Sequence, residues 1–210
     1  MAEEQNVIQW VYASKNEQEL AQRYDQWAKT YEEDLERDFS WYGPIRTVES
    51  AVKYVSKDAR ILDAGAGTGL VGALMAERGY QDLVAMDLSS GMLDEARKKN
   101  VYKEFHQMVM GETLGFDTDA FDAVMSVGVL TVGHAPASSL DELVRVTKPG
   151  GHIIYTLRPD LFEEGGFKEK HAELEAAGMW KVGEVSEPTR ILPKGEPDVF
   201  HQVWVQEVTS

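Results

Sequence analysis

The stretch ILDAGAGTGLVG, residues 61–72, places four glycines in eight positions directly after a short apolar run. Glycines gather in this way where the backbone needs a positive φ angle or comes close to another group. Two motifs overlap here: residues 67–72 form the GxGxxG fingerprint of dinucleotide-binding loops, and residues 63–69 form an acidic residue followed by GxGxG. Which glycines the loop uses depends on where the preceding strand ends.

The composition favours a single α/β domain and excludes several kinds of site. The 210 residues are 43% hydrophobic, which is enough for one sizeable core. No segment approaches the ~20 apolar residues of a membrane span. Cysteine is absent, so disulfides, thiolate nucleophiles and cysteine-based metal sites are excluded. The N-terminus is acidic and polar, unlike a secretory signal, and we expect a cytoplasmic protein.

The formal net charge of −15 argues against a nucleic-acid partner. Nucleic-acid affinity rests largely on lysine and arginine side chains that neutralise phosphates, and an acidic surface repels a polyanion. No pair of histidines and carboxylates has the spacing of metal ligands. The sequence therefore predicts no nucleic-acid, membrane or metal partner, and it leaves the oligomeric state open.

Hydrophobic spacing divides the chain into an N-terminal helical segment, residues 1–57, and a core, residues 58–210. The spacing predicts an amphipathic helix over residues 16–37 and a second helix from residue 45, after which strands and helices alternate. This alternation is typical of a parallel sheet with helices on both faces. The expected strands are residues 60–64, 82–86, 105–110, 121–127, 152–157, 180–185 and 199–208. The expected core helices are residues 70–78, 90–99, 139–148 and 167–177.

The register of the glycines favours the acidic GxGxG pattern over the dinucleotide fingerprint. A dinucleotide loop places its first glycine directly after the strand. Here that glycine would be Gly67, which already follows Asp63 at the strand end and Gly65. Close packing of the next helix on the sheet explains Gly72. The loop can therefore pass near a small ligand while Asp63 reaches a cationic group, at the carboxyl edge where such sheets bind ligands.

Four motifs lie in the order and spacing of a known family: ILDAGAGTG, VAMDLSSGML, FDAVMSVGVL and VTKPGGHIIYTLR. Together they resemble the class I S-adenosylmethionine-dependent methyltransferases over nearly the whole chain. YDQWAKTYEEDL, VGVLTVGHAP and ELEAAGMW are similar to the methyltransferase-like proteins of the Williams-Beuren syndrome region. The resemblance implies a seven-stranded, mostly parallel Rossmann-like sheet whose last strand is antiparallel. It also implies helices on both faces, an N-terminal helical lid, and S-adenosylmethionine as cofactor with S-adenosylhomocysteine as product.

The resemblance also implies a set of cofactor-binding residues. Asp87 is expected to accept hydrogen bonds from both ribose hydroxyls, with capping of the next helix as the alternative. Asp63 is expected to hold the methionine ammonium directly or through water, unless nearby amides satisfy it. Met92 is expected on the adenine face or in the core. The full expected set is Tyr24, Trp27, Tyr31, Asp63, Gly65, Ala66, Gly67, Gly69, Asp87, Leu88, Met92, Gly111, Glu112, Ser126 and Val127.

The adenine edge departs from the family pattern. Many relatives carry an aspartate after the third strand, whereas a count back from Phe121 places Met110 there, followed by Gly111 and Glu112. We therefore expect the backbone around Gly111, or the Glu112 side chain, to contact the adenine amine.

Aromatic residues in the N-terminal segment form a second candidate group. Tyr24, Trp27 and Tyr31 share one helical face, which is typical of core packing and equally of a lid over the cofactor. If they form a lid, Trp41 and Tyr42 continue the wall toward the substrate. A lid excludes water from a reaction in which charge moves from a sulfonium to the product.

Two polar residues are candidates for contact with the substrate. His134, after the fourth strand, is placed to deprotonate an acceptor, with an ordinary surface histidine as the alternative. Arg158, just past the fifth strand, is placed to pair with an acidic substrate or with a neighbouring carboxylate.

The sequence predicts methyl transfer to a small-molecule acceptor by in-line displacement in a lidded pocket. Three alternatives stay open: a cofactor-binding protein without methyltransferase activity, a methyltransferase that acts on a protein, and an NAD(P)-dependent oxidoreductase. The literal GxGxxG supports the last of these, and its register argues against it. The sequence does not identify the acceptor.

Overall fold

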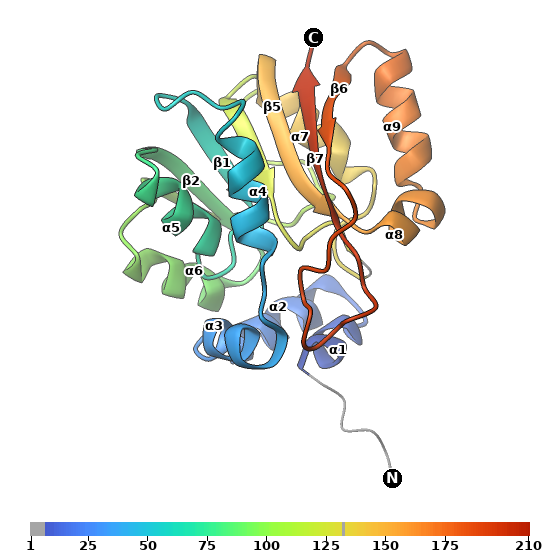
Figure 1. The fold of residues 1–210 in the computed structure, drawn as a ribbon. Helices are drawn as coiled ribbons and strands as arrows, with labels where there is room; N and C mark the ends of the chain where they lie inside the picture. The colour runs from blue at the N-terminus through green and yellow to red at the C-terminus, as the bar shows by residue number, and fades with distance from the viewer. Residues whose placement is uncertain (1–6, 132) are drawn as a thin grey trace.

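The structure, a computed structural model, describes residues 7–131 and 133–210. Its centre is a seven-stranded sheet of order β3-β2-β1-β4-β5-β7-β6 (Figure 1). Strands β1 to β5 are parallel, and β7 is antiparallel to both β5 and β6. The strands are β1 (Arg60–Ala64), β2 (Asp82–Asp87), β3 (Glu104–Gln107), β4 (Phe121–Ser126), β5 (Thr147–Leu157), β6 (Trp180–Val185) and β7 (Gln202–Val208). The predicted fold class is confirmed.

Both faces of the sheet are buried under helices. Along β1, Leu62 belongs to one hydrophobic core and Ile61 to the other, and both side chains are buried. Helices α7, α8 and α9 contribute to the first core, whereas α4, α5 and α6 contribute to the second. Burial on both faces explains why the central strands are continuous apolar runs. The helices are α4 (Gly43–Ala51), α5 (Leu70–Glu77), α6 (Ser90–Lys98), α7 (Ser139–Val146), α8 (Pro159–Glu164) and α9 (Phe167–Ala176).

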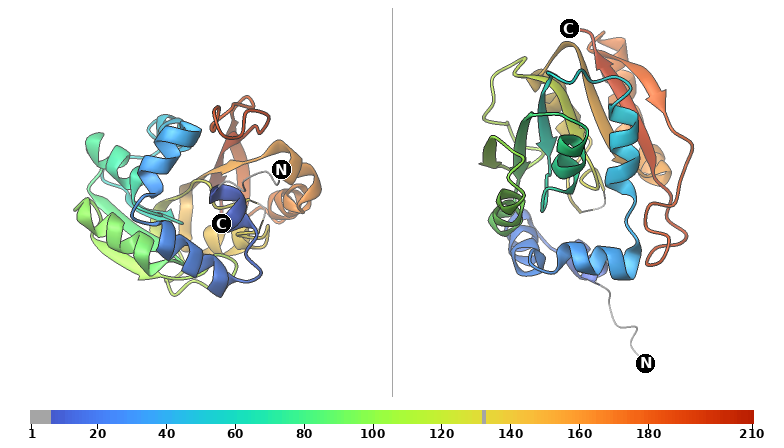
Figure 2. Two further views of the ribbon diagram at one scale, coloured as in Figure 1. Left: turned by 90° about the horizontal axis from the view of Figure 1, so that it is seen from below. Right: turned by 60° about the vertical axis from the view of Figure 1, so that its left-hand side comes forward.

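The N-terminal helices lie across the end of the sheet at which the parallel strands finish (Figures 1 and 2). They are α1 (Val7–Tyr12), α2 (Glu17–Trp27) and α3 (Tyr31–Asp34), followed by a π-helical turn, Leu35–Phe39. Their apolar side chains form a separate cluster with Ile191 and Leu192, from the connection between β6 and β7. The expected N-terminal segment also includes α4, which instead packs on the sheet. Helices α1 to α3 and the π-turn are called the lid below.

The prediction of one continuous helix over residues 16–37 is wrong in its middle. Helix α2 begins as expected, because the Asn16 side chain accepts a hydrogen bond from the Glu19 amide at 2.8 Å. The helix ends at Trp27, and a turn leads into α3. The Trp27 indole donates to the Asp34 carboxylate at 2.9 Å, and its ring packs edge-to-face on Tyr31 at 4.6 Å. These tertiary contacts outweigh the local helical pattern.

The third strand ends at Gln107 rather than at residue 110. The Met108 amide donates to the Asp87 carbonyl at 3.1 Å, and the chain then leaves the sheet. Residues 108–110 are thereby free to line a cavity. Helices α1 and α8 were not predicted, and the helix expected to approach residue 57 ends at Ala51.

Candidate functional site

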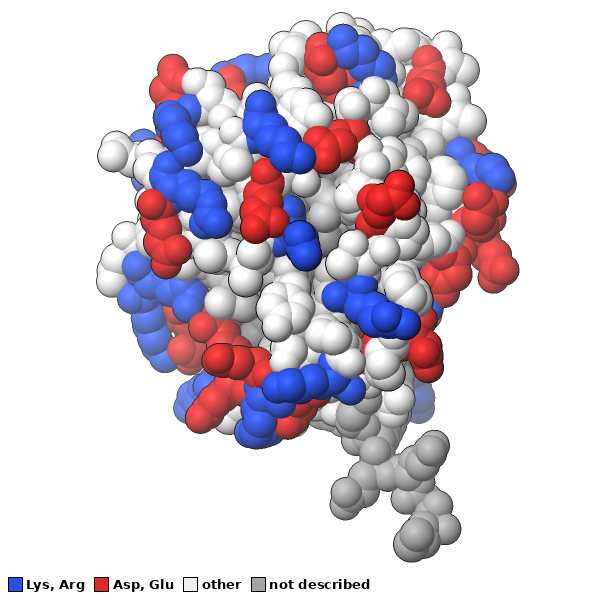
Figure 3. Space-filling model, viewed as in Figure 1, with Lys and Arg blue, Asp and Glu red and all other residues white. Residues whose placement is uncertain are grey.

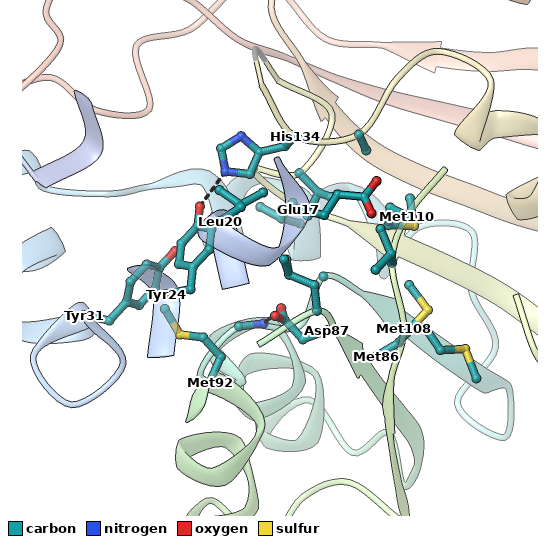
Figure 4. Close-up of a pocket in the computed structure, with 18 residues that line it drawn as sticks. Glu17, Leu20, Tyr24, Tyr31, Met86, Asp87, Met92, Met108, Met110 and His134 are labelled. Carbon is teal, nitrogen blue, oxygen red and sulfur yellow. Dashed lines mark hydrogen bonds between the residues drawn. The ribbon is translucent and has the colours of Figure 1, made fainter. Parts of the chain in front are cut away.

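A cavity of about 670 Å³ lies beneath α2, where β1, β2 and β4 end (Figure 4). We call it the first cavity. It is lined by Glu17, Leu20, Tyr24, Tyr31, Gly65, Gly67, Met86, Asp87, Leu88, Met92, Met108, Val109, Met110, Val127, Gly128, Val129, His134 and Ala135. The carboxylates of Glu17 and Asp87 are among them, whereas no lysine or arginine lines this cavity in the described parts of the chain. The site is therefore suited to a ligand with positive charge and poorly suited to a pyrophosphate.

The glycine loop is tied to the end of β2 by its own amides. Gly65 and Ala66 donate to the Met86 carbonyl at 2.7 and 2.9 Å, and the Gly67 amide donates to the Asp87 carboxylate at 2.8 Å. Gly67 has a φ of 54°, and a Cβ built on it meets nothing within 4 Å. The backbone at Gly67 thus forms an open floor of the first cavity.

The other glycines of the GxGxxG pattern serve the protein itself. The Gly69 amide donates to the Ala66 carbonyl at 2.9 Å, and the Gly72 amide donates to the Tyr102 hydroxyl at 3.1 Å. A Cβ at Gly72 would lie 2.2 Å from Cζ of Tyr102. Glycine is therefore needed at position 72 because it makes room for Tyr102. This reason is more specific than the close packing of helix on sheet that the sequence predicted. These amides are engaged and do not form a phosphate-binding nest.

The two glycine roles predict different outcomes for alanine substitutions. Gly72→Ala is expected to lower the free energy of unfolding by about 1–3 kcal/mol, because the new methyl group collides with the buried Tyr102 ring. Gly67→Ala is expected to weaken S-adenosylhomocysteine binding, because its methyl group enters open space in the cavity floor, and to lower stability only through the strain of a non-glycine residue at a φ of 54°. Urea denaturation and calorimetric titration measure the two effects. Cofactor binding lost in Gly72→Ala without loss of stability would contradict this assignment.

Asp87 lies at the end of β2 with its carboxylate at the first cavity (Figure 4). One oxygen accepts from the Gly67 amide at 2.8 Å and the other from the Ser89 amide at 2.9 Å. Burial raises the pKa of Asp87 to about 6, although these amide hydrogen bonds act in the opposite direction. A carboxylate has about four lone-pair positions, so both oxygens can still accept hydroxyl donors.

Asp63 is buried and does not line the first cavity, where the sequence analysis placed it. Its carboxylate is 3% exposed and accepts a hydrogen bond from the Tyr102 hydroxyl at 2.6 Å. Burial raises the pKa of Asp63 to about 7. Asp63 does not line the first cavity, because Tyr102 holds its carboxylate below the glycine loop. The expected contact of Asp63 with a ligand ammonium group, directly or through water, stays a prediction.

Tyr24, Tyr31 and His134 form the side of the first cavity nearest the lid (Figure 4). The Tyr24 hydroxyl lies 2.8 Å from Nε2 of His134, which joins α2 to the loop after β4. Loss of solvent raises the pKa of both tyrosines, so their hydroxyls stay protonated. In the tautomer of His134 that carries its proton on Nδ1, the Tyr24 hydroxyl donates to the lone pair of Nε2.

Asp25 fastens the lid to the core beside Asp87, a contact that the sequence analysis missed. Its carboxylate accepts from the Ser89 hydroxyl at 2.6 Å and from the Gly91 amide at 2.8 Å. It therefore satisfies donors at the beginning of α6 from a different helix. A second contact joins Glu32 to Lys99 at 2.8 Å. The sequence shows Asp25 next to Tyr24, but it does not show that the partners of Asp25 are Ser89 and Gly91.

A second cavity, of about 550 Å³, lies between the lid and the β6–β7 connection. It is lined by Ile8, Val11, Tyr12, Tyr24, Trp27, Tyr31, Leu35, Trp41, Gly128, Leu130, Thr131, Thr156, Ile191, Leu192 and His201. Trp27 therefore faces this cavity and not the first one. Trp41 also lines this cavity, and its role in a substrate wall stays a prediction. The two cavities share Tyr24, Tyr31 and Gly128.

Several expected residues lie outside both cavities. Gly111 and Glu112 are exposed and lie outside the wall of the first cavity. Residues 108–110 line that wall instead. The Ser126 hydroxyl donates to the Ala64 carbonyl at 2.9 Å and so ties β4 to β1. Tyr42 is 47% exposed, and Arg158 pairs with Asp160 at a separate depression. Ala66 and Gly69 shape the loop without lining the first cavity.

Sequence reasoning also missed much of the apolar wall of the first cavity. The missed lining residues are Glu17, Leu20, Met86, Met108, Val109, Met110, Gly128, Val129 and Ala135. Met86 had a local signal, because it immediately precedes Asp87 at a strand end. Nothing in the sequence indicated that residues 108–110 line a cavity, because their apolar pattern resembles a continuation of the third strand.

The residues of the first cavity fit S-adenosylmethionine. Its ribose hydroxyls are donors that match the Asp87 carboxylate, and its positive groups suit a cavity whose lining charges are acidic. Met86, Met92, Met108 and Met110 offer polarisable apolar surface for an adenine ring. In the same described residues, no group of three or more histidine, aspartate and glutamate side chains is placed to hold a metal ion. No helix in residues 7–131 and 133–210 is long and apolar enough to cross a membrane.

Comparisons with known proteins give the same family. Residues 62–155 match the family model described as a methyltransferase domain. Methyltransferase-like protein 27 of Homo sapiens is 35% identical over 173 residues, which are 78% of this chain and 70% of that protein. Demethylmenaquinone methyltransferase of Clavibacter sepedonicus is 44% identical over 98 residues, which are 45% of this chain and 39% of that protein.

A solved TehB-like S-adenosylmethionine-dependent methyltransferase from Corynebacterium glutamicum has the same fold. It aligns with a TM-score of 0.65 at 16% identity and covers 90% of this chain and 99% of its own. Similarity at this identity concerns the fold alone, whereas the family follows from the human relative and the matched domain. The chain belongs to the class I S-adenosylmethionine-dependent methyltransferases.

Proposed function

We propose that this methyltransferase acts on a small-molecule acceptor that binds in the second cavity. The observation that carries the proposal is the common wall of the two cavities, formed by Tyr24, Tyr31 and Gly128. A cofactor in the first cavity and an acceptor in the second meet at this wall. Placing two reactants next to each other in a fixed orientation supplies a large part of the rate acceleration in such reactions.

The lid and the glycine at the common wall position the acceptor. Gly128 has a φ of 75°, and its amide donates to the Thr156 hydroxyl at 2.8 Å. A Cβ there would lie 3.3 Å from the Trp41 ring, so glycine allows Trp41 to close over the junction. The aromatic rings of the lid exclude water from the junction. A dry, preorganised site suits a step in which a positive charge disappears.

Tyr24 and His134 are proposed to remove a proton from the acceptor. S-adenosylmethionine, when bound, supplies a methyl group on a sulfonium, and sulfur keeps both electrons of the carbon–sulfur bond that breaks. Tyr24 lines both cavities, whereas His134 lines only the first. A proton leaving an O–H or N–H acceptor therefore passes to the Tyr24 oxygen, and the phenol proton passes to Nε2 of His134, 2.8 Å away.

Other acceptors and functions are less well supported. A cavity lined by aromatic side chains from several parts of the chain suits a small molecule better than a protein segment. Demethylmenaquinone methyltransferase is one relative whose name gives a small-molecule acceptor. A nucleic-acid acceptor is disfavoured by the net charge of −15, and the face drawn in Figure 3 mixes acidic and basic side chains. The cytoplasmic location stays a prediction.

A screen of metabolite extracts tests the proposed function. The protein is incubated with extract and with S-adenosylmethionine that carries an isotope-labelled methyl group, and mass spectrometry then finds the labelled product. We expect a labelled small molecule and no label on protein. Label on protein would support the protein-acceptor alternative. S-adenosylhomocysteine binding without any labelled product would support the alternative of a cofactor-binding protein without activity.

The lid is expected to open and close around the cofactor. Asp25 and Tyr24 make polar contacts between α2 and the core, and lids of this kind belong to the low-stability parts of a fold. Amides of residues 16–37 should therefore exchange rapidly in the free protein and slow when S-adenosylhomocysteine binds. Hydrogen-exchange mass spectrometry measures this change, with β4 as the protected reference in both states. Strong and equal protection of the lid in both states would make its aromatic residues ordinary core.

A further inference from the structure

We infer that the methyl acceptor is an uncharged, planar and largely apolar molecule that carries a hydrogen-bonding group. The inference rests on the proposed function and names the substrate class of the second cavity. The inference depends on three features of the cavity: its aromatic surfaces, its lack of charge and its two unpaired polar atoms.

Aromatic side chains from separate parts of the chain surround this cavity. Trp27 and Tyr31 contact edge-to-face at 4.6 Å, and Tyr31 contacts Trp41 at 6.2 Å in a perpendicular arrangement. Tyr24 stacks on Trp27 at 6.2 Å with an interplanar angle of 15°. Rings held in this way offer both faces and edges to a ligand. A planar ring uses such surfaces better than a flexible chain does, because it loses little rotational freedom when it binds.

The cavity carries no formal charge at neutral pH. None of its lining residues in the described parts of the chain is an aspartate, glutamate, lysine or arginine. Burial lowers the pKa of His201 to about 4, so its ring is neutral. Arg158, the cation expected to meet an acidic substrate, pairs with Asp160 and does not line this cavity. A charged acceptor would lose its hydration without gaining a partner, which is costly.

Two polar atoms of the lining residues form no hydrogen bond of ordinary geometry within residues 7–131 and 133–210: the buried Thr131 hydroxyl and Nδ1 of His201. The Tyr12 hydroxyl lies near Thr131, and this contact lowers the pKa of Tyr12 while burial raises it. The His201 backbone is fixed independently, because it pairs with Thr189 through two hydrogen bonds of 2.8 and 2.9 Å. Buried polar groups in native proteins are nearly always bonded to protein, water or ligand. A hydroxyl, carbonyl or ring nitrogen of the acceptor would satisfy them.

Four probes that share one methyl-substituted ring test this inference. They are p-cresol, p-xylene, 4-methylbenzoate and 4-methylbenzylammonium, titrated by ligand-observed NMR into protein saturated with S-adenosylhomocysteine. We expect the two neutral probes to bind and the two charged probes to bind at least about tenfold more weakly. Equal or tighter binding of either charged probe would overturn the inference.

Substitutions locate the binding site and its polar contacts. Thr131→Val and His201→Phe keep the side-chain shape nearly unchanged and remove the unpaired atoms. Each should weaken p-cresol about 2- to 10-fold and leave p-xylene unchanged. His152→Phe is the control, because His152 lies beside Tyr54 and far along β5 from this cavity. Equal losses for both neutral probes would show a packing defect and would contradict the polar contacts.

The same titrations separate this inference from the proposed function. If S-adenosylhomocysteine binds and p-cresol does not, the acceptor class is wrong while the cofactor site stands. If calorimetry shows no binding of S-adenosylhomocysteine, the proposed function itself fails.

Discussion

Asp87→Ala is expected to weaken S-adenosylhomocysteine binding by about 10- to 150-fold. If Asp87 accepts from the ribose hydroxyls as predicted, the substitution removes hydrogen bonds to a charged acceptor, which contribute about 1.5–3 kcal/mol. The Gly67 and Ser89 amides also lose their acceptor, so the glycine loop at the floor of the first cavity is held less firmly. Calorimetric titration measures the affinity. Asp82→Ala is the matched control, since Asp82 lies at the opposite end of β2 and pairs with Lys103 at the surface.

The pH dependence of binding tests the same contact without a change in fold. The pKa of Asp87 is about 6 in the free protein, and hydroxyl donors favour its ionised form. Below pH 6, the Asp87 carboxyl group must therefore lose its proton before S-adenosylhomocysteine can bind tightly. Affinity should be constant from pH 7 to 8 and should fall by up to about tenfold per pH unit below the pKa. Asp87→Asn should lack this fall. Unchanged affinity in Asp87→Ala, or the same pH profile in Asp87→Asn, would remove Asp87 from the site.

His134→Asn is expected to lower kcat by about 100-fold or more for an acceptor that loses a proton. The asparagine amide reaches the position of Nδ1 and not that of Nε2, so the Tyr24 hydrogen bond is lost, and the amide cannot hold a proton. KM and S-adenosylhomocysteine affinity should change little, because the cavity shape is kept. Steady-state kinetics with the acceptor found by the extract screen measures this.

His152→Asn serves as the control for the loss of a histidine ring. His152 lines a different depression beside Tyr54, so this variant should keep full turnover. The pH profile gives a second readout, because loss of the proton-holding group should remove the acidic limb of kcat. If His134→Asn keeps both kcat and this limb, the proposed proton path is wrong. Alignment of acceptor and cofactor alone would then account for catalysis.

The sequence by itself determined the sheet and the identity of the glycine loop. The strand over residues 60–64 has the predicted bounds, because a buried strand is a continuous apolar run bounded by turn residues. The strand over residues 180–185 also has the predicted bounds, although it lies at the edge of the sheet and is largely exposed. The choice of the GxGxG pattern could also be made from local sequence, since it depends only on where a strand ends and where glycine permits a positive φ. Asp87 follows from the same local rule.

Only the tertiary structure decided which side chains line the two cavities. Asp63 has the sequence position of a ligand-binding acid, but Tyr102, 39 residues later, holds its carboxylate below the loop. Trp27 shares a helical face with Tyr24, yet the break after α2 places it in the second cavity. Asp25 acquires its role from Ser89, on another helix. Each outcome depends on contacts between residues distant in sequence, and periodicity describes only the faces of single elements.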